Sequence, residues 1–223
     1  MGKTLYLECN SGISGDMTVA ALLDLGADRK VLEEALKSLP VQGFEIEISR
    51  VKKAGLDACD FNVKLDKGHE NHDHDMEYLH GHEHHREHSA EEEQACNHSV
   101  TDGHTHTHAH SHGEQHVHSH EHHHAHEHRG LPEILDIIAG AAICDRARET
   151  AVKIFKVLAK AEAKAHGVPE NEVHFHEVGA VDSIVDIVAA AVCLDNLDIT
   201  EVIVPLLCEG RGTVRCQHGI LPV

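Results

Sequence analysis

The feature that most constrains this chain is a histidine-rich segment in its middle. Residues 69–128 hold 22 of the 26 histidines, together with 13 acidic residues and a single basic one. The segment shows no apolar periodicity, so it lacks the buried surface that would offset the entropy cost of an ordered chain. We therefore expect residues 69–129 to be a disordered, metal-binding insertion. It would separate the two halves of one globular domain, residues 1–68 and 130–223.

The flanking residues carry the patterns of both helices and strands. Alternating apolar residues predict strands at 4–9, 44–49 and 59–65, and the apolar segment 202–207 predicts a last strand. Helical spacing, with capping and stop residues, predicts helices at 17–25, 28–39, 132–143, 145–166 and 181–197. The first and last strands are both apolar and can lie side by side. The predicted fold class is α+β (mixed α/β), one sheet with flanking helices.

Charge and composition exclude several classes of protein. The chain has 19 Lys and Arg against 38 Asp and Glu, a formal net charge of −19, which excludes a nucleic-acid partner that needs basic residues. No apolar run approaches the ~18 residues of a membrane span. The 7 cysteines never form C-x-x-C and indicate reduced thiols, which favours a cytoplasmic protein.

The insertion predicts metal binding. In its alternating runs every second residue is a histidine, so an extended chain places many imidazoles on one side. Imidazole suits zinc, nickel, copper and iron, and affinity rises toward nickel and copper. Ligation needs neutral imidazole and should weaken as the pH falls through about 6.5. A solvated segment without a role is the alternative. The candidate ligands are His104, His106, His108, His110, His112, His116, His118 and His120.

A second candidate site lies before and within the last long helix. His174 and His176 point the same way in an extended segment and make a pair of imidazole ligands. Asp182 and Asp186 are four residues apart and share a helix face. Asp186 stands among apolar residues, where a carboxylate is expensive unless it is paired or binds a metal. A hydrogen-bonded structural cluster, with Asp182 serving only the helix start, is the alternative.

Two glycine-rich loops are weaker candidates. Gly12, Ser14, Gly15 and Asp16 lie between a strand and a helix, where backbone N–H groups favour an anion such as phosphate. A tight turn, with Asp16 as a helix cap, explains the same residues. Near the C-terminus, Arg211 and Arg215 are cations in an acidic chain, and His218 follows Cys216 at a spacing of two. A plain hairpin is the alternative there.

Three segments resemble the LarC family of nickel insertion proteins, and a histidine-rich insertion between the first two is also similar to that family. The segments are residues 7–17, 173–187 and 216–223. The resemblance implies a nickel insertase, a cyclometallase of the lyase class. Such a protein inserts nickel into pyridinium-3,5-bisthiocarboxylic acid mononucleotide and consumes CTP. The product is the nickel-pincer cofactor of lactate racemase-type enzymes.

The resemblance also implies partners and residue roles. His174, His176 and a carboxylate would hold nickel, His176, Glu177 or His218 would serve catalysis, and Arg211, Arg215 or the Gly12–Asp16 loop would hold the substrate phosphate. Family members continue past Val223, so we expect this chain to be the N-terminal portion. A separate chain could then supply the C-terminal domain, with CTP and Mg²⁺ or Mn²⁺. We also expect a homo-oligomer and a lactate racemase-type apoenzyme as cofactor acceptor.

Two other functions fit the residues. A non-catalytic nickel storage or delivery protein would need only the insertion. A metal-dependent phosphohydrolase would combine donors from both candidate sites, namely Asp16, His174, His176, Asp182 and Asp186.

Overall fold

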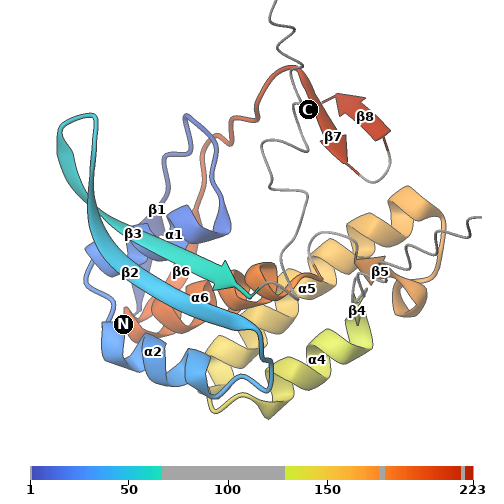
Figure 1. The fold of residues 1–223 in the computed structure, drawn as a ribbon, viewed down its shortest axis with the longest axis horizontal. Coiled ribbons are helices and arrows are strands. Elements are labelled where there is room, and N and C mark those ends of the chain that lie inside the picture. The colour runs from blue at the N-terminus through green and yellow to red at the C-terminus, as the bar shows by residue number, and fades with distance from the viewer. Residues whose placement is uncertain (1, 67–128, 176–178, 217–218, 223) are drawn as a thin grey trace, which may run out of the picture.

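The computed structural model describes residues 2–66, 129–175, 179–216 and 219–222 (Figure 1). The predicted disorder of the insertion falls outside these ranges, except that Arg129, its last residue, lies in a strand. None of the described helices is both long and apolar enough to cross a membrane.

Both halves of the chain contain helices and strands. The first half contains β1 (Lys3–Tyr6), α1 (Gly15–Asp24), α2 (Arg29–Lys37), β2 (Phe44–Lys53) and β3 (Leu56–Leu65). The second half begins with β4 (Arg129–Gly130), α4 (Leu131–Gly140), α5 (Asp145–His166), η2 (Glu170–Glu172) and β5 (His174–Phe175). It continues with α6 (Val181–Asn196), β6 (Ile199–Ile203), β7 (Thr213–Cys216) and β8 (Gly219–Pro222).

Local signals set the ends of several helices, as the sequence predicts. The Asp28 carboxylate caps α2 by accepting the N–H of Lys30 at 2.8 Å. Pro132 stands in the first turn of α4, where its missing N–H costs nothing. Helix α5 ends at Gly167, whose φ of 68° is the left-handed conformation that glycine tolerates.

The mixed α+β class is confirmed, but the described strands lie in four two-stranded sheets where we predicted one sheet. Strands β1 and β6 lie side by side, as expected for the first and last predicted strands. They are parallel, while β2–β3, β4–β5 and β7–β8 are antiparallel. The β2–β3 hairpin packs against α1 and α6 and does not pair with β1. Strand β6 lies a few residues earlier than predicted, because Pro205 has no N–H for a strand ladder.

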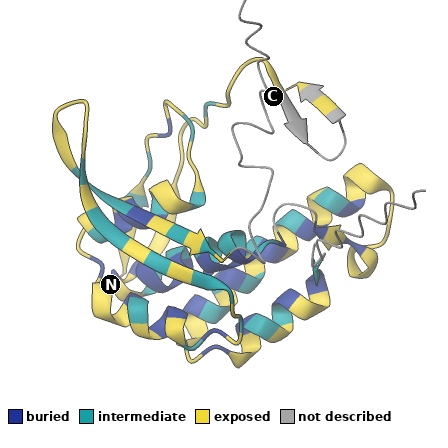
Figure 2. Ribbon diagram, viewed as in Figure 1, coloured by how far each residue is buried: buried dark blue, intermediate teal, exposed yellow. Residues whose placement is uncertain are grey.

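Helix α6 is the centre of the molecule. It packs against α1, α2, α5, β3 and β6, and Figure 2 shows buried residues along its length. Ile184, Val185 and Val188 are completely buried, which confirms the prediction that this apolar helix is central. Elements from both sides of the insertion thus share one hydrophobic core.

Candidate functional site

Three carboxylates come together at the starts of two packed helices. Asp16 lies in the first turn of α1 and Asp182 in the first turn of α6, with Asp186 one turn further along α6. Helices α1 and α6 pack against each other, and the charges of Asp16 and Asp182 both act on Asp186. The first turn of each helix offers N–H groups and a positive dipole end, which favour negative charge.

Gly15 allows α1 to approach Asp186 closely. A Cβ atom at position 15 would stand 2.4 Å from Oδ2 of Asp186 and 2.7 Å from its Cβ. The backbone N–H of Asp16 hydrogen-bonds the Asp186 carboxylate. A side chain at position 15 would therefore displace either the start of α1 or the carboxylate itself.

The Asp186 carboxylate is incompletely paired. Its Oδ1 atom is fully covered and accepts no hydrogen bond in the described structure. Burial, followed by the charges of Asp16 and Asp182, raises the pKa of Asp186 to about 7, against the opposing hydrogen bond from the Asp16 backbone. A cation beside Oδ1 would stabilise the ionised form, so the site has the electrostatics of a cation acceptor.

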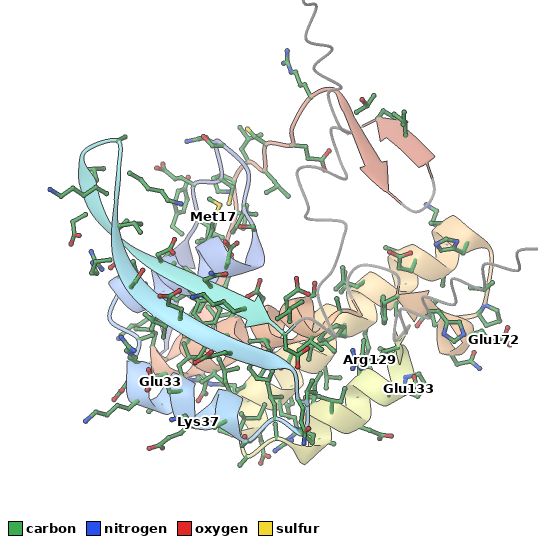
Figure 3. The ribbon with its side chains drawn as sticks, viewed as in Figure 1. Met17, Glu33, Lys37, Arg129, Glu133 and Glu172 are labelled. Carbon is green, nitrogen blue, oxygen red and sulfur yellow. The ribbon has the colours of Figure 1, made fainter. Side chains whose placement is uncertain are left out.

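The other two carboxylates have local partners. The Ser14 hydroxyl donates to Asp16 Oδ1 and does not cap α1. Asp182 accepts the N–H of Ser183 at 2.8 Å. Asp16 is exposed, and Met17 after it is 50% exposed on the first turn of α1 (Figure 3), so the group of carboxylates reaches solvent on the α1 side.

The carboxylates do not form a complete metal site by themselves. Within the described ranges, no group of three or more His, Cys, Asp or Glu side chains is arranged to hold a metal ion. A metal bound to Asp186 would therefore need a further donor or a shift of the side chains. Two predicted donors that precede α6, His176 and Glu177, lie outside the described residues.

His174 lies on β5 and is exposed, and it is not among the groups that act on Asp186. Strand β5 pairs with β4, which places Arg129 opposite Phe175 and Gly130 opposite His174. Phe175 is buried and anchors β5 through an edge contact with Phe155, at 6.2 Å between ring centroids. The residues that follow the histidine-rich insertion thus form β4, which lies beside the strand that carries His174. Arg129 of β4 is labelled in Figure 3.

The loop before α1 is a tight turn. Gly12 has a φ of 84°, and its N–H donates to the Cys9 carbonyl at 3.2 Å. Arg211 is exposed. Arg215 lies in β7, and the structure describes its backbone only. His218 also lies outside the described residues, and so do the eight predicted metal ligands of the histidine-rich insertion, from His104 to His120.

Sequence reasoning missed two tertiary features, one at these carboxylates and one at the end of the β1–β6 pair. The steric need for Gly15 depends on the approach of α6, which no local pattern signals. The contact between Cys208 and Cys9 is the second feature. The Cys208 N–H donates to the Cys9 carbonyl at 3.2 Å, just beyond the end of the parallel pair β1–β6. The predicted adjacency of the first and last strands was the available signal for this contact, because residues that follow neighbouring strands can meet at one edge.

Known proteins give a consistent set of matches. The family of nickel insertion proteins matches residues 5–223. A pyridinium-3,5-bisthiocarboxylic acid mononucleotide nickel insertion protein of Alkaliphilus metalliredigens is 51% identical over the whole chain and 44% of its own length. A protein of the same name from Clostridium acetobutylicum is 45% identical over 99% of the chain and 47% of its own length.

No solved structure matches the chain significantly. The chain spans less than half the length of these curated relatives. The family match nevertheless runs from β1 to the C-terminus and includes every described helix. The chain therefore belongs to the nickel insertion protein family.

Proposed function

We propose that this chain is the nickel-binding part of an enzyme that inserts nickel into pyridinium-3,5-bisthiocarboxylic acid mononucleotide. The names of the relatives support the substrate. In this chain, the observation that supports the proposal is the covered Oδ1 of Asp186, which accepts no hydrogen bond and lies near the carboxylates of Asp16 and Asp182. An acidic, partly covered oxygen site suits a divalent cation that must later be released to a stronger sulfur donor.

The proposed path of nickel starts at the histidine-rich insertion, which gathers Ni²⁺ at many weak sites. The insertion leads into β4, which pairs with the strand of His174. From His174 and His176 the ion passes to Asp182 or Asp186. The soft thiocarboxylate sulfurs of the substrate then take the ion.

The remaining roles are proposed from the family resemblance. The ring carbon of the substrate loses its proton as the carbon–nickel bond forms, and His176, Glu177 or His218 accepts that proton. Arg211, Arg215 or the loop of Gly12, Ser14, Gly15 and Asp16 holds the substrate phosphate. CTP with Mg²⁺ or Mn²⁺ would act through the part of the family protein that this chain does not match. The finished cofactor goes to a lactate racemase-type apoenzyme in the cytoplasm.

The test follows nickel from the protein into the substrate. The nickel-loaded chain is mixed with the mononucleotide, with and without CTP and Mg²⁺, and nickel in the small-molecule fraction is measured. We expect Asp186→Asn and His174→Ala to slow the transfer at least tenfold. Asp136→Asn is the matched control, because Asp136 is exposed on α4 away from the three carboxylates.

Two results would contradict the proposal. A native transfer rate in Asp186→Asn would remove the carboxylates from the path of nickel. Nickel binding without any transfer to the mononucleotide, under every condition, would favour the storage function.

A further inference from the structure

An apolar surface surrounds β6 and is exposed to solvent. It consists of Tyr6 on β1 and the residues from β6 onward that are each between 41% and 58% exposed, which are Val202, Ile203, Val204, Leu206 and Leu207. We call this set the β6 surface. Soluble proteins rarely leave so many neighbouring apolar side chains uncovered, and such patches mark interaction sites.

The backbone of β6 is also open on one side. Leu7 donates its N–H to the Ile203 carbonyl at 2.9 Å, so Ile203 faces β1. Because successive residues of a strand alternate, the N–H groups of Val202 and Val204 face the other edge, where the described residues place no strand. Parallel strands are normally covered on both faces, and free edges are normally short or protected by charge. The described residues do not cover β6 fully, because the side chains of Val202, Ile203 and Val204 are each more than 40% exposed.

The chain beyond β6 leads away from the body of the molecule. Figure 1 shows the β7–β8 hairpin standing apart from the helices, and the hairpin packs chiefly on itself. Ile220 in β8 is 62% exposed. A further exposed apolar side chain thus lies on the hairpin, beyond the exposed polar residues Glu209 and Arg211.

We propose that the β6 surface is where the other half of the nickel insertion protein docks, with a strand added alongside β6. The matched relatives contain more than twice the length that this chain covers, so each includes a further polypeptide of at least similar size. This docking proposal rests on the family membership of the chain and does not depend on which residues bind nickel.

Two other occupants fit less well. The histidine-rich insertion is mostly polar and acidic in sequence, which suits it poorly to cover Val202 and Leu206. A second copy would bring together two chains that each carry a formal net charge of −19, and like charge opposes close association.

Hydrogen exchange tests the docking on intact proteins. Amide exchange is measured in this chain and in the full-length Alkaliphilus metalliredigens relative, which aligns with all of it. We expect the amides of Val202 and Val204 to exchange at least tenfold faster in this chain than the aligned amides in the relative. The β2–β3 hairpin is the internal control and should exchange at similar rates in both.

Equal exchange at the β6 positions in the two proteins would overturn the proposal. Protection in this chain that grows with its concentration would also overturn it, because a second copy would then be the occupant. A Leu206→Glu variant adds a second readout. It should keep the circular dichroism of the chain and lower its binding of a hydrophobic dye, and unchanged dye binding would contradict an accessible apolar surface.

Discussion

Among the described carboxylates, Asp186 has the environment that departs most from that of an ordinary surface carboxylate. Burial comes first among the causes, followed by the charges of Asp16 and Asp182, and together they raise its pKa from the usual 3.8 to about 7. The folded protein therefore binds a proton at Asp186 more tightly than the unfolded chain does. Linkage then makes this contribution to stability fully present below pH 4 and lost as the pH rises through 7.

The first prediction is a pH-dependent difference between the native chain and Asp186→Asn. Without metal, the native chain should lose about 1–2 kcal/mol relative to the variant between pH 4 and pH 8, after allowance for solvent screening. Urea unfolding followed by circular dichroism measures the difference. Asp136→Asn should follow the native curve. Parallel curves for the native chain and Asp186→Asn would show that Asp186 titrates normally.

A second prediction concerns the glycine that faces Asp186. Gly15→Ala should destabilise the chain by about 1–3 kcal/mol, because the new methyl group overlaps Asp186 although alanine favours helices. Gly140→Ala is the comparison, since its Cβ would meet the Pro40 ring, with Cγ nearest at 3.1 Å, and no carboxylate is among the nearest atoms. Thermal unfolding of both variants measures the effect. If Gly15→Ala is no less stable than Gly140→Ala, the close approach of α1 to Asp186 is wrong.

At the scale of elements, the β2–β3 hairpin depends on a two-residue turn. Ala54 and Gly55 both have positive φ angles, 52° and 83°, and connect the paired residues Lys53 and Leu56. This is the conformation that two-residue hairpins prefer, but alanine tolerates it poorly. The turn residue at position 54 is therefore not the best one for its conformation.

Two substitutions in this turn should have opposite effects. Ala54→Asn should stabilise the chain by about 0.5–1 kcal/mol, because asparagine accepts the left-handed conformation more readily. Gly55→Ala should destabilise it by about 1 kcal/mol or more, because it adds a Cβ at a φ of 83°. Urea unfolding of the two variants provides the check, and effects of the same sign would contradict this turn geometry.

Elements with strong local signals could be predicted from the sequence. The Asp28 cap of α2, the Gly167 end of α5 and the apolar pattern of α6 placed those helices within a few residues, although Cys144 and not the expected Asp145 caps the start of α5. The pairing of β1 with β6 also followed from their apolar character. The separation of the strands into pairs could not be predicted, because it depends on the packing of the β2–β3 hairpin against α1 and α6.

The candidate site was only partly predictable for the same reason. The cost of placing Asp186 in an apolar helix was visible in the sequence. The nearness of Asp16 was foreseen only in the phosphohydrolase interpretation, because it arises from the contact between helices that lie far apart in the chain. The steric constraint at Gly15 is purely tertiary and has no local signature.

At the scale of the whole molecule, the two halves on either side of the insertion form one core. Strand β1 pairs with β6, and α1 and α2 pack on α6. The entropy cost of closing a loop grows slowly with its length, so a long insertion between the halves is tolerated. Replacing residues 69–128 with a short Gly-Ser linker should therefore leave a folded domain with the same circular dichroism.

Calorimetric titration of Ni²⁺ into that linker variant tests the central claim most directly, which is that the domain core holds nickel at the carboxylates of α1 and α6. We predict one Ni²⁺ per chain, lost in Asp186→Asn and kept in Asp136→Asn, while the intact chain binds several more ions. A folded linker variant that binds no nickel, or that binds it unchanged in Asp186→Asn, would contradict the claim.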